Sequence, residues 1–261
     1  MLQKNPTIGL ALGAGGARGL AHIGVLETFE KENINVDYIA GSSIGSMIGG
    51  IYSCNIPINY IKGLAYEINW EYLRDLTFPR QGMIKGEKLL NFLEIITKNR
   101  NIEDLSIPFS AVACDIEQGE EIIFSEGNLP SSIRASTSIP GIFVPYSYQG
   151  HLLVDGAVLN RVPINIVKEM GADIVIGVDV GRREINNEVN NIFDILLNTF
   201  DIMQKEFQNI KKHNSDIIIE PAVTDISAFN LNKADYCINS GIEATKKIIP
   251  ELRRLIKERS G

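Results

Sequence analysis

Residues 36–52 read VDYIAGSSIGSMIGGIY, an apolar run, a serine flanked by glycines, and a second apolar stretch. The first run predicts a buried strand and the last stretch a helix. The segment GSSIG between them has two interpretations. It is either a tight turn that uses the backbone freedom of glycine, or a nucleophile elbow, G-x-S-x-G, with Ser43 at its tip between Gly41 and Gly45. Because glycine and serine are common, the rest of the sequence has to decide.

The N-terminal part repeats the order of strand, glycine loop and helix. TIGLAL (7–12) predicts a buried strand, GAGGARG (13–19) a loop, and the residues up to Lys31 a helix. Such a loop points backbone N–H groups at something negative, or serves only as a tight turn. A dinucleotide site of the G-x-G-x-x-G type does not fit. Its sixth position is Arg18, and the nearest acid, Asp37, begins the next strand instead of following it.

Strands and helices alternate along the chain, which predicts an α/β fold with a mostly parallel sheet covered on both faces. We see no repeat or linker and expect a single domain over 1–261, with the motifs in about 7–165. The other predicted elements are a helical stretch over 57–98 broken around 78–82, strands over 107–115, 120–124, 151–154, 173–180 and 216–221, a helix with a core-facing stripe over 189–213, and a final helix from about Lys233 that bends or restarts at Pro250.

Charge and cysteine content limit the partners. The 261 residues carry a net charge of −7 with no long basic run, which argues against nucleic acid and against strong attraction to anionic lipid. Cys54, Cys114 and Cys237 are odd in number and widely spaced, as expected for buried thiols in a reducing cytoplasm. No segment has the apolar length of a membrane span, and the N-terminal apolar stretch is too short for a signal peptide. We therefore expect a soluble, cytoplasmic protein.

A carboxylate follows the strand predicted over 151–154. Alone, Asp155-Gly156-Ala157 indicates a turn. Together with a serine elbow and an amide-rich loop, it supplies the third part that acyl transfer needs: a nucleophile, oxyanion donors and a base.

None of the three histidines has a clear claim to complete a triad. His22 lies within the first predicted helix and His213 at the end of a long one. His151 precedes Asp155 by four residues on one strand, so the two side chains would stand roughly 13 Å apart. We therefore expect the carboxylate to act on the serine directly.

Four motifs, GAGGARG, GSSIG, ASTSIP (135–140) and DGA (155–157), occur in this order. With their flanks they resemble the patatin-like phospholipases, in particular the small bacterial members, and the resemblance extends over nearly the whole chain. One departure is Ala14, where many relatives have a third glycine. The resemblance implies a three-layer α/β/α fold.

It also implies a catalytic dyad in which Ser43 is the nucleophile and Asp155 the base. The oxyanion hole falls on the loop that carries Gly15, Gly16 and Arg18. The glycines that support the motifs are Gly13, Gly41, Gly45 and Gly156.

The activity implied is hydrolysis of acyl esters in phospholipids, lysophospholipids or neutral acylglycerols, with no metal and no cofactor. Two alternatives stay open. An acyltransferase would use the same acyl-enzyme, and a histidine beside the nucleophile would favour it, but Ser42 occupies that position. A non-catalytic lipid-sensing protein would have the same fold. Head group, chain length and oligomeric state do not follow from the sequence.

The stretch 57–98 is rich in aromatic and aliphatic residues and includes the one tryptophan, Trp70. These side chains either pack on the sheet or form a mobile helical cap over Ser43. The apolar face of such a cap would meet acyl chains, a membrane or a micelle surface. The residues concerned are Ile58, Tyr60, Ile61, Leu64, Trp70, Tyr72, Leu73, Phe78, Met83 and Ile84, with breaks at Pro79 and Gly82.

Overall fold

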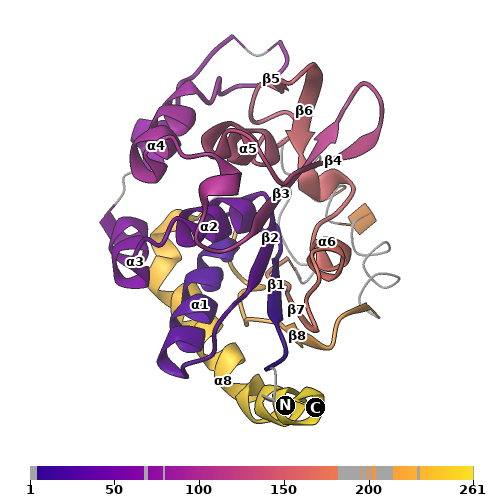
Figure 1. Ribbon diagram of the computed structural model, residues 1–261. Coiled ribbons are helices and arrows are strands. Elements are labelled where there is room, and N and C mark those ends of the chain that lie inside the picture. The colour runs from indigo at the N-terminus through magenta and orange to yellow at the C-terminus, as the bar shows by residue number, and fades with distance from the viewer. Residues whose placement is uncertain are drawn as a thin grey trace.

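The computed structural model (Figure 1) describes residues 5–67, 70–78, 80–181, 214–227 and 230–260, together with 195, 199, 202 and 203. Apart from these four residues, the helix predicted over 189–213 lies outside the described residues, and so does His213.

A mixed eight-stranded sheet forms the centre of the molecule, in the order β5-β6-β3-β2-β1-β7-β8, with β4 also paired to β3. Its parallel strands are β1 (Ile8–Leu12), β2 (Tyr38–Ser42), β3 (Phe109–Asp115), β7 (Ile174–Val178) and β8 (Ile217–Ile219). Antiparallel pairing adds β4 (Glu120–Phe124), β5 (Tyr146–Tyr148) and β6 (His151–Asp155).

Helices cover both faces of this sheet, which gives the three-layer α/β/α arrangement (Figure 1). Side chains alternate between two cores, because successive residues of a strand point to opposite faces. On β1, Leu10 and Leu12 belong to the larger core and Ala11 to the smaller one. The larger core lies under α1 (Ala21–Lys31), α2 (Ile44–Ser53), α3 (Ile58–Glu67), α4 (Glu87–Thr97), α5 (Leu129–Ser136) and α8 (Ala234–Arg259), and the smaller one under α6 (Ile164–Glu169).

The register places the ends of β2 and β6 against each other. On β3, Ser42 pairs with Val112, and Asp155 pairs with the next residue, Ala113. β4 pairs with both of these β3 positions and therefore occupies the other edge of β3. β2 and β6 must then share one edge and meet end to end, because a strand has only one neighbour on each side. The residues that follow β2 and end β6 are brought together by this pairing.

The stretch 57–98 is less helical than the sequence predicts. Between α3 and α4 the described residues contain only a short 3₁₀ helix, Trp70–Leu73, and 74–78 and 80–86 are irregular. This irregular part is anchored by backbone pairing, since Val144 donates to the carbonyl of Ile84 at 2.9 Å. The backbone groups that a continuous helix over 57–98 would use are engaged in these hydrogen bonds, and Gly82 disfavours a helix at this point. Both effects explain why the predicted helical stretch is interrupted.

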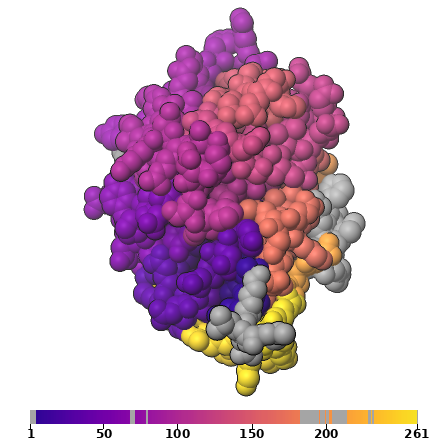
Figure 2. Space-filling view, in the orientation of Figure 1, coloured from indigo at the N-terminus to yellow at the C-terminus, as the bar shows by residue number. Residues whose placement is uncertain are grey.

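The C-terminal helix packs against the N-terminal half of the chain. In the space-filling view α8, in yellow, lies against the indigo N-terminal part (Figure 2). α8 is continuous through Pro250, so the helix does not restart there, and a bend at this proline stays a prediction. Burial of Ile249 and Leu252 on either side of the proline compensates for the lost backbone hydrogen bond.

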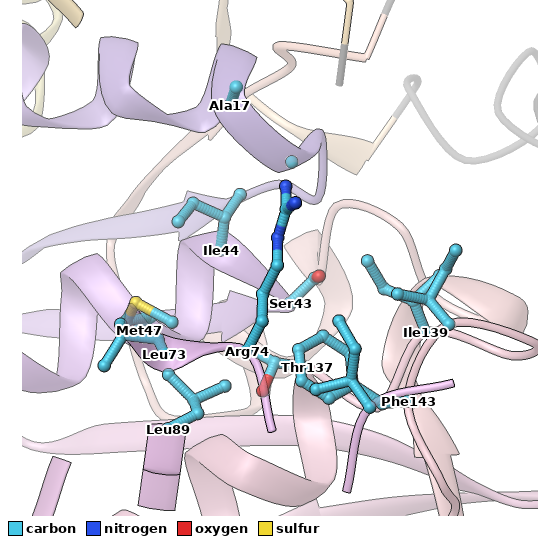
Figure 3. Close-up of a pocket in the computed structure, with 13 residues that line it drawn as sticks. Ala17, Ser43, Ile44, Met47, Leu73, Arg74, Leu89, Thr137, Ile139 and Phe143 are labelled. Carbon is cyan, nitrogen blue, oxygen red and sulfur yellow. The ribbon is translucent and has the colours of Figure 1, made fainter. Parts of the chain in front are cut away.

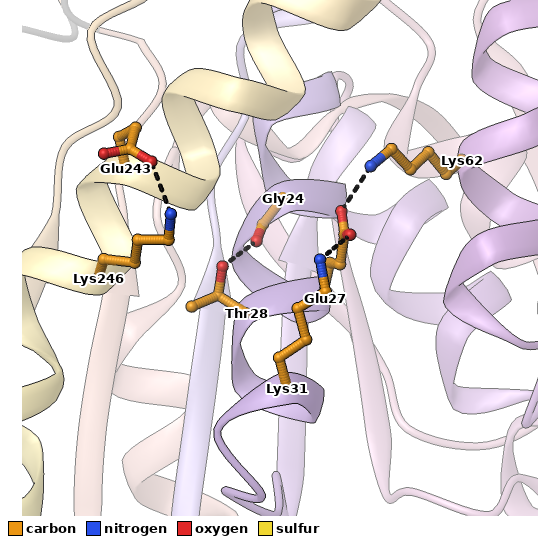
Figure 4. A network of polar contacts seen from close by, with 7 residues as sticks. All are labelled: Gly24, Glu27, Thr28, Lys31, Lys62, Glu243 and Lys246. Atoms are coloured by element: carbon orange, nitrogen blue, oxygen red, sulfur yellow. Dashed lines mark hydrogen bonds and ion pairs between the residues drawn. The ribbon is translucent and has the colours of Figure 1, made fainter.

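α3 is tied to α1 by a charged contact (Figure 4). Glu27 of α1 accepts hydrogen bonds from Lys31 at 2.5 Å and from Lys62 of α3 at 2.8 Å. Burial opposes the charge of Glu27, yet the two lysines hold its pKa below the ordinary value. With Ile58 and Ile61 buried, α3 forms part of the core.

Candidate active site

Ser43 stands at a sharp turn between β2 and α2. Its backbone has φ 55° and ψ −125°, a conformation that side-chain-bearing residues rarely adopt and that stores strain. The neighbouring glycine makes the turn possible, because a Cβ on Gly45 would lie 2.0 Å from the carbonyl oxygen of Leu12. The turn therefore has the geometry of a nucleophile elbow, not of an ordinary hairpin.

The Ser43 hydroxyl is hydrogen-bonded to the carboxylate that ends β6. Ser43 Oγ donates to Asp155 Oδ2 at 2.5 Å, and the other carboxylate oxygen accepts from the N–H of Ala157 at 2.9 Å. Both residues of this pair are buried. The end-to-end meeting of β2 and β6 thus produces a serine and a carboxylate with no histidine between them.

Burial changes the acidity of Asp155. It raises the pKa from 3.8 to about 6, although the hydrogen bonds from Ser43 and Ala157 and the positive charge of Arg161 act in the opposite direction. A carboxylate with this pKa is ionised at neutral pH and accepts a proton more readily than an exposed one. This property is needed by a group that removes a proton from a serine hydroxyl.

The segment 134–138 holds both members of the pair in place. Ser136 Oγ accepts a hydrogen bond from the N–H of Ser43 at 2.9 Å. The carbonyl of Ser138 accepts from the N–H of Asp155 at 2.9 Å. These contacts explain the position of the ASTSIP motif, which the sequence associates with the site but does not place.

Sequence reasoning missed Arg134, the residue that supports this segment. Its guanidinium is almost fully buried and donates to Ser138 Oγ at 2.6 Å and to the carbonyls of Lys85, Gly86 and Val144. Burial lowers its pKa to about 10, so it stays charged at neutral pH. The available signal was an arginine directly before the motif, on a helix whose other residues are apolar or small.

The glycine loop is held by hydrogen bonds on both sides. The N–H groups of Gly13 and Ala14 donate to the carbonyls of Val178 and Arg161. His22 Nε2 lies 2.7 Å from the carbonyl of Gly13. Burial lowers the pKa of His22 to about 4, so the ring is neutral at pH 7 and donates this contact from Nε2. The role of His22 is therefore structural.

The next residues of the loop leave backbone donors unused. Gly16 has φ 58°, which favours glycine, and among the described residues no carbonyl accepts from the N–H of Gly15 or Gly16. Arg18 is buried, and its guanidinium donates to the carbonyl of Gly15 at 3.1 Å and to that of Gly181. The arginine thus holds the loop and is not among the residues that line the cavity beside Ser43.

His151, the histidine nearest to Asp155 in the sequence, pairs with a different carboxylate. His151 Nδ1 lies 2.7 Å from Asp115 Oδ2, so within the described chain its carboxylate partner is Asp115, not Asp155.

An apolar cavity of about 160 Å³ opens beside Ser43 (Figure 3). Among the described residues that line it, Arg74 alone carries a charge. Figure 3 shows the guanidinium of Arg74 pointing towards the Ala17 end of the cavity. The remaining lining residues are Gly16, Ile44, Met47, Leu73, Ile84, Leu89, Thr137, Ile139, Ile142 and Phe143. Such a cavity suits an alkyl chain.

The family model of the patatin-like phospholipases matches residues 10–168, more than half of the chain. The chain belongs to the patatin-like phospholipase family. The matched part contains the glycine loop, Ser43 and Asp155.

Other members of the family are similar at the level of sequence. An uncharacterized NTE family protein of Mycobacterium tuberculosis is 36% identical over 185 residues, which are 70% of this chain and 51% of the relative. Lysophospholipase NTE1 of Scheffersomyces stipitis is 31% identical over 252 residues, 94% of this chain and 16% of that protein. Human patatin-like phospholipase domain-containing protein 6 is 37% identical over 188 residues, 68% of this chain and 14% of that protein. The patatin-like chain therefore spans about half the length of its mycobacterial relatives and a smaller share of the other two.

Two solved structures share the fold. VipD from Legionella pneumophila has a TM-score of 0.65 at 12% identity, covering 98% of this chain and 67% of that one. The type III effector protein ExoU has a TM-score of 0.53 at 9% identity, covering 98% and 54%.

Two further findings concern the described residues alone. None of their helices combines the length and apolarity required to cross a membrane. Their histidine, cysteine and carboxylate side chains form no group of three or more that could hold a metal ion.

Proposed function

We propose that the protein is a hydrolase of lipid acyl esters, with Ser43 as nucleophile and Asp155 as general base. The observation that carries this proposal is the 2.5 Å hydrogen bond between Ser43 Oγ and Asp155 Oδ2 beside an apolar cavity. Nucleophile and base are within hydrogen-bond reach, and the elbow exposes the hydroxyl to that cavity.

In the first half-reaction, Asp155 takes the proton of Ser43 as the serine oxygen attacks the ester carbonyl carbon. The oxyanion that forms accepts hydrogen bonds from the N–H groups of Gly15 and Gly16. Arg18 holds this loop in position through its hydrogen bond to the carbonyl of Gly15. Collapse of the tetrahedral intermediate breaks the bond to the alcohol, and Asp155 returns the proton to that alcohol oxygen. The product is an acyl ester on Ser43.

In the second half-reaction, water replaces the alcohol. Asp155 takes a proton from the water as its oxygen attacks the acyl carbon, and it returns this proton to Ser43 Oγ when the bond to the enzyme breaks. A free fatty acid leaves, and the enzyme is regenerated without a metal or cofactor.

We further propose a phosphate-containing substrate, a phospholipid or lysophospholipid. Arg74 supplies a positive charge at a cavity that is otherwise apolar, in a protein of net charge −7. Its partner is Glu71 at 2.8 Å, in an exposed ion pair that a phosphate can replace at small cost. The name of the yeast relative, Lysophospholipase NTE1, agrees with this substrate class.

The place of action that we propose is a lipid surface reached from the cytoplasm. In the segment that supplies Leu73 and Arg74 to the cavity, Tyr72, Leu76 and Phe78 are 75%, 76% and 78% exposed, as side chains at a membrane interface would be. The described cysteines are free and buried, as expected in a reducing compartment.

Labelling with a fluorophosphonate probe tests the proposal. The adduct should map by mass spectrometry to the peptide containing Ser43, and Ser43→Ala should remove both the label and the turnover of p-nitrophenyl esters. The matched control is Ser53→Ala, which changes a buried serine at the far end of α2, away from the site, and should keep both. A label that persists in Ser43→Ala would contradict the assignment.

Two soluble substrates that differ only in the head group test the role of Arg74. We expect Arg74→Gln to lower the ratio of kcat/KM for dihexanoylphosphatidylcholine over dihexanoylglycerol by about tenfold, as for a charge-assisted contact near the surface. The control is Arg80→Gln, an exposed arginine of the same segment that does not line the cavity. An equal fall on both substrates would assign Arg74 to the chemistry instead.

A further inference from the structure

A second apolar cavity, of about 30 Å³, lies next to the one beside Ser43. Met47 of α2 lines both cavities and therefore lies at the boundary between them. The residues that line the second cavity are Leu20, Ile23, Met47, Ile48, Ile51, Ile61, Leu64, Ala65 and Phe92. None of these described side chains is charged or hydrogen-bonding, so the second cavity suits hydrocarbon and not a polar group.

Two helices run from the first cavity to the second. Ser43 directly precedes α2, and Met47 and Ile51 of that helix follow it at intervals of four residues, so the three lie on one face. On α4, Leu89 lines the first cavity and Phe92 the second, again at neighbouring positions of one face. Figure 3 shows Met47 and Leu89 together at the same side of the first cavity. The two cavities therefore lie one after the other between α2 and α4, leading away from the Ser43 hydroxyl, with Met47 between them.

We propose that the acyl chain of the substrate follows a path through both cavities and that Met47 determines the preferred chain length. The inference rests on the proposed function, since it assumes an acyl group on Ser43. The thioether side chain of Met47 is buried and unbranched, so it can move to admit a chain into the second cavity. α3, tied to α1 through Lys62 and Glu27, closes the far end with Ile61 and Ala65.

Helix geometry sets the expected chain length. Four residues of α2 advance about 6 Å and eight residues about 12 Å. An extended chain of C–C bonds of about 1.5 Å advances a little over 1 Å per carbon, so it passes Met47 after about five carbons and reaches Ile51 after about ten. Butanoyl esters should therefore end before Met47, and dodecanoyl esters should occupy both cavities.

A chain-length series of p-nitrophenyl esters, used below their micellar concentrations, tests the proposal. We expect Met47→Phe to lower the ratio of kcat/KM for the dodecanoyl over the butanoyl ester by about tenfold, and Met47→Ala to raise it several-fold. Ile51→Phe narrows only the second cavity and should lower the same ratio, which keeps the test available if Met47→Phe folds poorly. Leu93→Ala is the control, because this buried residue of α4 lines neither cavity.

The outcomes separate the two proposals. An unchanged ratio in Met47→Phe, Met47→Ala and Ile51→Phe, with turnover still lost in Ser43→Ala, would overturn the acyl path and leave the hydrolase in place. Turnover that survives in Ser43→Ala would remove the proposed function itself. A ratio that shifts equally in Leu93→Ala would assign the effect to general loosening of the core, and this too would overturn the role of Met47.

Discussion

Replacing Asp155 by asparagine tests the central electrostatic feature of the site. Burial raises the pKa of Asp155 from 3.8 to about 6, so the folded protein at pH 8 holds a carboxylate charge that its surroundings disfavour. A shift of about two pKa units corresponds to about 3 kcal/mol. The folded state binds the proton more tightly than the unfolded chain. The protonated group therefore favours folding fully below about pH 4, and this contribution is lost as the pH rises through 6.

Asparagine can keep both contacts of Asp155 without the charge. Its carbonyl oxygen can accept from the N–H of Ala157, and its NH₂ group can donate to Ser43 Oγ. We expect Asp155→Asn to be inactive, yet more stable than the parent at pH 8 by up to about 3 kcal/mol, a rise in Tm on the order of 5 °C. At pH 4 the two proteins should unfold at similar temperatures. Thermal and urea unfolding followed by circular dichroism between pH 4 and 8 measure this.

Asp115, the last residue of β3, provides a control in which stability should depend on pH in the opposite direction. The hydrogen bond from His151 holds the pKa of Asp115 below its ordinary value. The charged form of Asp115 therefore stabilises the fold above the unfolded pKa, and this contribution is lost as the pH falls. Asp115→Asn should be less stable than the parent at pH 8, with a difference that shrinks in acid. The reasoning fails if Asp155→Asn loses stability at pH 8, or if its stability difference from the parent is the same at pH 8 and pH 4.

Further predictions concern the base, the loop and the surface near the cavity. kcat/KM on a soluble ester should fall about tenfold per pH unit below about pH 6, where Asp155 becomes protonated; an acid limb near pH 4 would contradict the burial argument. Ser43→Ala combined with Asp155→Asn should cost little more activity than either change alone, and additive losses would show that the two act separately. Gly16→Val should lower kcat on the order of 100-fold with a smaller change in KM, whereas a change in KM alone would move Gly16 from the oxyanion to substrate binding. Short-chain phospholipid micelles should shift the emission of Trp70 to the blue, and an unchanged spectrum would argue against contact of this segment with lipid.

The chemistry of the site was more predictable than its geometry. GSSIG and DGA each fit an ordinary turn when taken alone, but in combination with the glycine loop they predict Ser43 and Asp155 as the reacting pair from local patterns. The sequence also predicts the parallel strands, since buried strands are continuous apolar runs. Both kinds of inference use residues that are neighbours in the chain.

The geometry depends on pairings between distant residues. The antiparallel strand β6 meets β2 on one edge of β3 because of a register that no local pattern contains. Arg134 donates to the backbone carbonyls of Lys85, Gly86 and Val144. Every residue has a backbone carbonyl, so the sequence contains no signal for these contacts. The same is true of the described residues between Arg74 and Gly86, where backbone hydrogen bonds to Ile142 and Val144 replace the helical pattern.

Unfavourable features converge on a small volume at the end of β2. Ser43 has a positive φ, Asp155 is a buried acid, and Arg134 is a buried cation whose described polar partners are carbonyls and one hydroxyl. Glycine at position 43 and asparagine at position 155 would each relieve one of these costs. Stability alone therefore does not explain the residues present, whereas the proposed attack by Ser43 requires a hydroxyl at the cavity, a basic carboxylate and a rigid support together. The costs persist because Ser136, Ser138 and the backbone carbonyls around Arg134 hold these groups in place, and this is the physical reason to propose that the chemistry takes place here.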